Sequence, residues 1–379
     1  GKMIAIMVAI YKIAKSRDSV TGIFPRPLSL LQLIPHQSRA SGLCLSLRGP
    51  VVVPQPEIVQ NVLIPASPEL QIRIYQCRRQ ISKALTSHAD SNGTKIPFLV
   101  VTGPSYVSDP DQIKGCSRWI GSLLGSKLDI LDNANLPSNL EPLFNSRPAE
   151  NIVDLLNLLV AMRTNMSQKN EEIDSSGKTY EIEHGIPFCR ALMCEMAEIC
   201  PIVGEISDTI TPQYLSDLYS LGMISSTLLE SQLHREIALG ISYPIGFRTL
   251  DTEADIQEDM YSYRVSSALD SMYATSQQHQ FLSVTKIGTV GIVGTIGNED
   301  TFLTLLVNEK LDKKALNRYI EQIYLYKALS SDVKFPRILL DVGVINNSNL
   351  SLRLQTVESL ILEHKPGIIG VVVNSGDCY

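Results

Sequence analysis

The sequence predicts an α/β protein built on a (β/α)8 barrel, with an N-terminal extension and an inserted β-hairpin. Two observations carry this prediction. Eight short apolar runs follow one another along the chain, and seven of them are followed by a stretch with helical periodicity. Strands that alternate with helices form a parallel sheet covered by the helices, and eight repeats fit a closed barrel better than an open sheet. The dinucleotide-binding alternative lacks its fingerprint, because no G-x-G-x-x-G follows any run.

The individual elements can be justified in chain order. An amphipathic helix is expected over Pro68–Ser87, because apolar side chains recur there at helical spacing and Ser67 can cap the first turn. The expected strands are the eight apolar runs: Leu99–Thr102, Leu128–Leu131, Ile202–Ile206, Gly222–Ser226, Tyr243–Phe247, Thr301–Leu306, Arg337–Asp341 and Ile368–Val373. The expected barrel helices are Pro110–Leu124, Ile186–Ile199, Pro212–Ser220, Ser231–Leu239, Ala254–Ala274, Leu311–Ala328 and Leu350–His364.

Two segments depart from the simple repeat. Phe281–Lys286 and Thr289–Gly294 flank Ile287-Gly288, which predicts a hairpin inserted before the sixth strand. Residues 141–183 form a long connection, in which we expect a helix at Asn151–Met162 followed by a polar tail over 168–177. A long loop after the second strand would lie at the catalytic end of a barrel, where it could act as a lid.

Composition and charge exclude several classes of protein. An apolar content of 44% excludes disorder over most of the chain. The longest early apolar run, Met3–Tyr11, falls short of the roughly 20 residues that a membrane helix needs. A net charge of −6 and an aromatic content of 6% argue against a nucleic-acid interface. A small-molecule partner is therefore expected, with no nucleic acid and no membrane span.

The basic residues are unevenly distributed, which suggests three segments. Residues 1–48 hold seven of the 33 basic residues but one of the 39 acidic ones, so the remaining chain carries a net charge of about −12. We expect 1–48 to be a flexible basic arm, with an organelle leader or a docking arm as alternatives. We expect residues 49–95 to form an extension ahead of the barrel and 96–379 to form the barrel, without a helix after the eighth strand. The seven cysteines include no C-x-x-C pair, which favours thiols in a reducing, cytoplasmic compartment.

Four motifs lie between residues 205 and 300: Asp208–Leu215, Glu230–Glu236, Gly240–Phe247 and Phe281–Lys286. Together with weaker support from Ile64–Ala66, Gly103-Pro104 and Asp109-Pro110, they resemble the class I 3-deoxy-D-arabino-heptulosonate 7-phosphate (DAHP) synthases, the first enzymes of the shikimate pathway. The resemblance covers residues 49–379. It implies the same barrel, an extension that helps form dimers and often an effector site, and condensation of phosphoenolpyruvate with erythrose 4-phosphate on a divalent metal.

The metal ligands that the resemblance implies are missing from this sequence. Ser105 stands in place of a Cys after the first strand, Val344 in place of a His after the seventh, and Asn374 in place of a Glu at the end of the eighth. The fourth ligand, an Asp, would fall beyond Tyr379. Since Ser, Val and Asn do not make a tight transition-metal site, we expect no metal and no other cofactor.

The phosphate-binding cations that the resemblance implies are also replaced. Thr227 and Leu306 stand where it implies arginines, and Leu131–Asn139 replaces a cationic loop after the second strand. Arg248 stands in place of a Lys and keeps the charge with a different geometry. The pocket should therefore be less charged and more apolar than in the family. Its expected substrate-binding residues are Ser105, Tyr106, Thr227, Leu306, Val344 and Asn374.

Four charged residues are the catalytic candidates: Lys286, Glu205, Arg248 and Asp341. A desolvated Lys286 could bind an anion or act as a base; otherwise it is a hairpin lysine that supports the wall or faces solvent. Glu205 ends the third strand and could serve the pocket or form an ion pair with Arg248. Arg248 ends the fifth strand, where it suits a carboxylate or phosphate, and Asp341 ends the seventh.

Three functions follow from this pattern of retained scaffold and altered chemistry. The first is a recruited, metal-independent enzyme that performs cyclisation, isomerisation or carbon–carbon bond formation in secondary metabolism. The second is a non-catalytic paralogue that pairs with an active DAHP synthase or binds an effector. The third is an active synthase with an unusual site. A homodimer is expected, with a heteromer containing an active DAHP synthase as the alternative. A mouth filled by its own side chains would favour the second function.

Overall fold

The structure is a computed structural model that describes residues 53–86, 97–107, 110–125, 158–166, 185–251, 258–329, 337–344, 349–364 and 367–374. The expected basic arm, the expected strand at Leu128–Leu131, the Leu131–Asn139 replacement and the polar tail at 168–177 lie outside these described residues.

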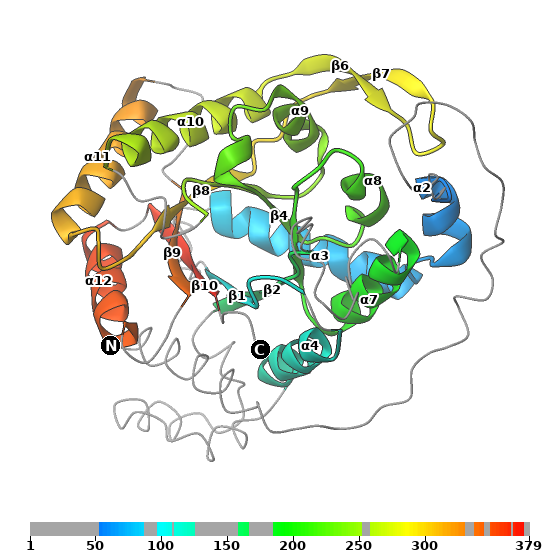
Figure 1. The fold of residues 1–379 in the computed structure, drawn as a ribbon, viewed down its shortest axis with the longest axis horizontal. Helices are drawn as coiled ribbons and strands as arrows, with labels where there is room; N and C mark the ends of the chain where they lie inside the picture. The colour runs from blue at the N-terminus through cyan, green and yellow to red at the C-terminus, as the bar shows by residue number, and fades with distance from the viewer. Residues whose placement is uncertain are drawn as a thin grey trace, which may run out of the picture.

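Eight parallel strands close into a barrel, as the sequence predicts (Figure 1). Around the barrel the order is β1-β10-β9-β8-β5-β4-β3-β2, and pairing between β1 and β2 closes the ring. The strands are β1 (Phe98–Gly103), β2 (Leu158–Arg163), β3 (Ile202–Glu205), β4 (Leu221–Ile224), β5 (Ile245–Arg248), β8 (Thr301–Leu306), β9 (Ile338–Val344) and β10 (Ile368–Asn374).

The second strand is not where the sequence pattern placed it. Residues Leu158–Arg163 form β2, paired with β1 through Phe98–Leu158 and with β3 through Arg163–Val203. The expected helix at Asn151–Met162 is therefore wrong over its last five residues. The run Leu158–Met162 is apolar throughout, and a short apolar run fits a buried helix and a buried parallel strand equally well by periodicity.

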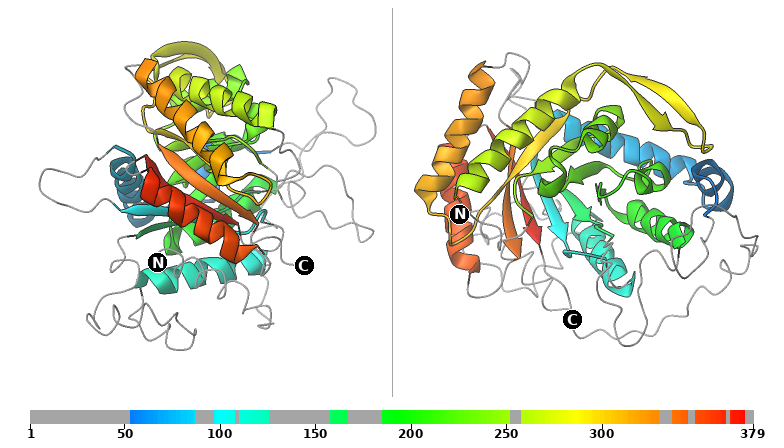
Figure 2. Two further views of the ribbon diagram at one scale, coloured as in Figure 1. Left: turned by 90° about the vertical axis from the view of Figure 1, so that its left-hand side faces the viewer. Right: turned by 45° about the horizontal axis from the view of Figure 1, so that its top comes forward.

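Helices surround the barrel on its outer side (Figures 1 and 2). They are α4 (Pro110–Gly125), α7 (Gly185–Ile199), α8 (Thr211–Leu215), α9 (Gln232–Gly240), α10 (Glu258–Ser276), α11 (Lys313–Leu329) and α12 (Leu350–Glu363), with a 3-10 turn η4 at Ser226–Leu228. Seven of seven predicted barrel helices are thus present, and only α8 is markedly shorter than expected. Ser231 caps α9 by accepting from the backbone N–H of His234.

The N-terminal extension closes the bottom of the barrel. It begins with α2 (Pro56–Ile58) and the π-helical turn η2 (Val59–Leu63), followed by α3 (Pro68–Thr86). Ile81 and Leu85 of α3 are buried in one apolar cluster with inward-facing strand residues such as Leu99 and Phe302. The Ser82 hydroxyl donates to Asp300, just before β8, at 2.6 Å. α3 therefore covers the amino ends of the strands, and their carboxyl ends lie at the opposite end of the barrel.

The predicted hairpin is confirmed as β6 (His279–Val284) and β7 (Val290–Thr295), which pair antiparallel outside the barrel sheet. The hairpin arches away from α10 toward α2, as Figures 1 and 2 show. One face of it carries Leu282, Val284, Val290 and Ile292, and all four side chains are exposed. Leu282 pairs across the strands with Ile292, and Val284 with Val290, so this apolar face is contiguous.

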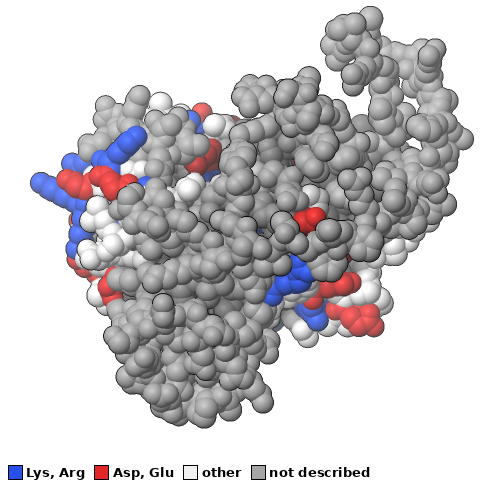
Figure 3. Space-filling view, turned by 60° about the horizontal axis from the view of Figure 1, so that its bottom comes forward, with Lys and Arg blue, Asp and Glu red and all other residues white. Residues whose placement is uncertain are grey.

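Three general properties of the described residues bear on function. None of their helices is both long and apolar enough to cross a membrane. On the face drawn in Figure 3, the Lys and Arg side chains that can be seen lie beside Asp and Glu side chains rather than in a patch of one sign. The cysteines in the described ranges form no disulfide: Cys77, Cys116, Cys189, Cys194 and Cys200.

Candidate functional site

A layer of polar side chains crosses the inside of the barrel at the carboxyl ends of its strands. Side chains alternate in and out along a strand, and the inward cluster includes Val101, Ala161 and Val203. Two residues further along their strands, the same face therefore carries Gly103, Arg163 and Glu205. The other members of this polar layer are Arg248, Asp341 and Asn374, each at or near the end of its own strand. This is the end at which barrel enzymes place their sites.

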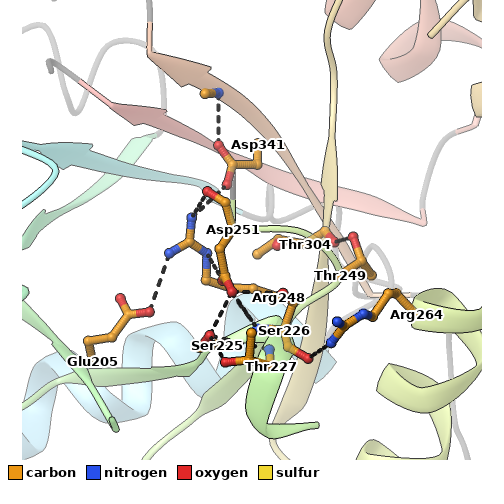
Figure 4. A network of polar contacts seen from close by, with 11 residues as sticks. Glu205, Ser225, Ser226, Thr227, Arg248, Thr249, Asp251, Arg264, Thr304 and Asp341 are labelled. Carbon is orange, nitrogen blue, oxygen red and sulfur yellow. Dashed lines mark hydrogen bonds and ion pairs between the residues drawn. The ribbon is translucent and has the colours of Figure 1, made fainter. Parts of the chain in front are cut away.

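Arg248 is the centre of the polar layer (Figure 4). Its guanidinium lies 3.3 Å from Glu205, 3.6 Å from Asp251 and 3.6 Å from Asp341. Burial opposes the charge on Arg248, but the carboxylates of Glu205, Asp341 and Asp251 outweigh it and raise its pKa above the ordinary value. The expected Glu205–Arg248 ion pair is therefore present, and Arg248 serves three internal acids at once.

The Asp341 carboxylate is held by the turn that follows its strand. Its Oδ1 accepts from the backbone N–H of Gly343 at 2.9 Å. Gly343 has φ of +65°, a left-handed conformation that a glycine adopts without a Cβ clash. The sequence Asp341-Val-Gly-Val344 thus fixes the direction in which the carboxylate points.

Arg163 is a second buried guanidinium in the polar layer. It ends β2, and Gly103 of the neighbouring strand packs directly against its backbone. Burial lowers its pKa, the nearby charge of Arg248 adds to this effect, and Glu205 and Asp341 oppose it. Its Nη1 is buried and has no hydrogen-bond partner among the described residues. A buried donor left without a partner is costly, which makes this nitrogen a candidate for contact with a bound molecule.

Asp251 joins the strand end of β5 to the loop after β4. Its Oδ2 accepts from the hydroxyls of Ser225 at 2.6 Å and Ser226 at 2.7 Å. Both of its carboxylate oxygens lie 3.1 Å from the backbone nitrogen of Ser226, which opens η4. Arg264 donates to the carbonyl oxygen of Ser226 from the outside. Two hydroxyls, one backbone N–H and Arg248 therefore converge on a single carboxylate (Figure 4).

Two of the three positions that the resemblance assigns to a metal are bonded to each other. The Ser105 hydroxyl donates to Oδ1 of Asn374 at 2.9 Å. Val344 offers no donor atom, and its side chain is 45% exposed. Within the described ranges no three His, Cys, Asp or Glu side chains come together as metal ligands would. A neutral hydroxyl–amide pair beside a valine does not fit a divalent transition metal.

The remaining substrate-binding candidates occupy different surroundings. Leu306 is buried and pairs with Asp341 across β8 and β9, so both point inward. Thr227 is exposed, and its hydroxyl lies 2.9 Å from that of Ser225. Tyr106 follows Ser105 just after β1 and is partly buried. Tyr106 lies close enough to Arg163 to affect its pKa, and Leu306 lies beside Asp341.

Lys286 does not belong to this group, which corrects the expectation that it serves the barrel mouth. It is exposed in the turn between β6 and β7. Its Nζ donates to Gln60 of η2 at 2.7 Å, and its carbonyl oxygen accepts from the backbone N–H of Glu57. The supporting role considered for it in the hairpin is the one that the structure describes.

Sequence reasoning missed two residues of the site. Arg163 was hidden because the run before it was assigned to a helix; an apolar run ending in a cation was the available signal. Asp251 lies three residues after the fifth strand, and this proximity to a strand end was its only signal in the sequence. Neither the cation at the end of an apolar run nor the proximity to a strand end indicates which side chains contact these two residues.

Fold and site together define a class of protein: a (β/α)8 barrel, closed below by a helix, with a buried polar layer at the end where small molecules bind. The sequence model of the DAHP synthetase I family matches residues 170–373, more than half of the chain. The chain belongs to this family.

Individual relatives agree with this assignment. The chain is 35% identical over 234 residues to the phenylalanine-inhibited phospho-2-dehydro-3-deoxyheptonate aldolase of Saccharomyces cerevisiae, across 58% of this chain and 60% of that protein. It is 28% identical over 320 residues to the Phe-sensitive aldolase of Escherichia coli K12, across 82% and 79%. It is 32% identical to the aldolase AMT16 of Alternaria alternata, across 58% of each protein. The chain thus spans about 60% of the length of the two fungal relatives.

A solved structure matches the fold. The phospho-2-dehydro-3-deoxyheptonate aldolase of Francisella tularensis aligns with a TM-score of 0.62 at 21% sequence identity, over 87% of this chain and 86% of that one.

Proposed function

We propose that this chain is a DAHP synthase-like enzyme that has lost the synthase reaction and acts without a metal on a substrate less charged than two phosphate esters. The reactions that suit such a site are cyclisation, isomerisation and carbon–carbon bond formation, of the kind used in secondary metabolism. The observation that carries the proposal is the Ser105–Asn374 hydrogen bond beside Val344, where the resemblance implies metal ligands. A site without a Lewis acid depends on shape, hydrogen bonds and acid–base groups.

The polar layer supplies these groups. Nη1 of Arg163 would donate to an oxygen of the substrate, which would satisfy its unused hydrogen-bonding capacity. Glu205 and Asp341 would hold or accept protons, and Arg248 would keep both carboxylates in place. Leu306 supplies an apolar wall beside Asp341. Substrate binding by Ser105, Tyr106, Thr227, Val344 and Asn374 is part of the same proposal.

An activity assay tests the loss of the synthase reaction. The purified chain is incubated with phosphoenolpyruvate and erythrose 4-phosphate, with and without added Mn²⁺, beside the Escherichia coli relative as the positive control. We expect no condensation product from this chain under either condition. Turnover that depends on Mn²⁺ would contradict the proposal and identify the chain as an active synthase, the activity for which its relatives are named.

A second candidate function is a non-catalytic paralogue that pairs with an active synthase. The observation that favours it is that the charge of Arg248 is already offset by the carboxylates of Glu205, Asp251 and Asp341. The unused Nη1 of Arg163 favours the enzyme instead. A pull-down that uses this chain as bait and an active synthase as prey distinguishes the two, because only the paralogue needs the heteromer.

The homodimer and the cytoplasmic location are parts of the proposed enzyme. The apolar face of the β6–β7 hairpin is a surface on which a second copy of this chain could pack, because Leu282 and Ile292 are 69% and 76% exposed. Light scattering on the purified chain measures the oligomeric state. A dimer agrees with the expectation, and a monomer at micromolar concentration contradicts it.

A further inference from the structure

Asp251 is surrounded by the donors that proteins use to bind an external oxyanion. The backbone N–H of Ser226 and the hydroxyls of Ser225 and Ser226 all reach its carboxylate. The Arg248 guanidinium completes the set, with its Nε 3.6 Å from Oδ1. Main-chain N–H groups, hydroxyls and a guanidinium recur as binding groups for phosphate and carboxylate ligands. Here a side chain of the same protein occupies them.

The Asp251 carboxylate lies at the end of the barrel where a ligand would bind. Ser225 and Ser226 follow β4, and Asp251 follows β5, so the donors and the acceptor lie at the carboxyl end of the barrel, where barrel enzymes bind their ligands. Asp251 itself is not deeply buried, with 21% of its side chain exposed. A ligand that enters the mouth therefore meets a negative charge at the place where the donors would otherwise face it.

The charges of the whole layer strengthen this effect. Three acids, Glu205, Asp251 and Asp341, share Arg248, and Arg163 is the second guanidinium nearby. The five groups carry one more negative than positive charge. Nη1 of Arg163, at the end of β2, has no hydrogen-bond partner within the described part of the chain and could bind an anionic oxygen of a ligand. The Asp251 carboxylate, after β5, would repel the same oxygen.

We propose that the Asp251 carboxylate occupies a group of hydrogen-bond donors that would otherwise bind an oxyanion. It thereby excludes phosphate groups from the β4–β5 side of the barrel mouth. The inference rests on the proposed function, because it names the ligand chemistry that the proposed site rejects. The substrate carries a neutral group toward Asp251 and places its anionic oxygen, where it has one, at Arg163.

Removal of the Asp251 carboxylate should convert the donor set into a phosphate site. Asp251→Ala frees the two serine hydroxyls, the Ser226 N–H and one edge of Arg248. Asp300→Asn is the matched control, because it removes one carboxylate charge at the opposite end of the barrel, where Asp300 accepts from Ser82. Inorganic phosphate is titrated into each protein by isothermal calorimetry. We expect Asp251→Ala to bind phosphate at least about ten-fold more tightly than the wild type, and Asp300→Asn to match the wild type.

A second measurement covers the case in which Asp251→Ala folds poorly. Formate is small enough to take the place of the missing carboxylate, so it should raise the melting temperature of Asp251→Ala and leave those of the wild type and Asp300→Asn unchanged. Asp251→Asn, which keeps the shape and loses the charge, should show a smaller gain in phosphate affinity.

The outcomes separate this inference from the proposed function. Equal phosphate affinity in the wild type and Asp251→Ala, or no formate response in Asp251→Ala, would overturn the role of Asp251 alone. Condensation of phosphorylated substrates by the wild type would overturn the proposed function directly, whatever the variants bind.

Discussion

Replacement of Arg248 by Met tests the electrostatic account of the barrel mouth. The substitution keeps an unbranched side chain of similar length and removes the single cation within 4 Å of Glu205, Asp251 and Asp341 among the described residues. The side chains of Glu205 and Asp341 are 9% and 3% exposed, so water cannot replace the lost partner. Removal of one partner of a buried ion pair costs about 3–5 kcal/mol of unfolding free energy. We expect Arg248→Met to lie at the upper end of this range.

Arg353→Met provides the comparison. The Arg353 side chain is 2% exposed and that of Arg248 10%, but the Arg353 partner Glu309 is 35% exposed and can regain water. Arg353 also donates to the carbonyl oxygen of Val342. Its replacement should therefore cost about 2 kcal/mol.

Urea unfolding followed by circular dichroism measures the free energy of unfolding of both variants at pH 7. An Arg248→Met loss no larger than that of Arg353→Met would refute the account of Arg248 as the shared partner of three acids.

The other predictions concern packing, thiol reactivity and the unused guanidinium. Gly246→Ala should lower the melting temperature and the free energy of unfolding, the latter by about 1–3 kcal/mol, because a Cβ there would lie 2.2 Å from the Phe302 ring. Gly115→Ala is the control: the added Cβ meets open space, so the melting temperature should rise. Burial raises the pKa of Cys189 to about 11, so alkylation at pH 8, followed by mass spectrometry, should be about 100-fold slower than for an ordinary cysteine; an equal rate would contradict this. Arg163→Met should leave the free energy of unfolding unchanged or increase it, because the substitution removes an unpaired buried donor. The same variant should no longer bind anionic ligands in a thermal-shift screen. A large loss of stability would show that Arg163 is structural.

The sequence predicted the barrel because its signal is repeated. Each apolar run with a following amphipathic stretch is weak evidence alone, but seven such pairs in order restrict the topology to few solutions. The failure at the second strand has a physical cause. Leu158–Met162 is buried in the sheet and has no polar alternation, so local pattern could not distinguish it from a helix. Pairing with β1 and β3 decides its conformation.

The site was predictable only where strand ends were correctly located. Glu205, Arg248 and Asp341 each lie at or next to the end of a predicted strand, and the barrel brings them together. Lys286 matched a motif by position, but the hairpin turns it toward Gln60 instead. The partnership of Asp251 with Ser225 and Ser226 depends on two loops from adjacent strands, and sequence separation carries no information about that contact.

The metal content of the purified chain tests the central claim most directly, namely that the family scaffold persists while its metal chemistry does not. The chain is saturated with Mn²⁺, dialysed against metal-free buffer and analysed by inductively coupled plasma mass spectrometry, with the Escherichia coli relative treated in parallel. Because Ser105 and Asn374 bond to each other beside Val344, the account predicts only traces of metal in this chain. Stoichiometric metal that survives dialysis and is removed by a chelator would contradict it.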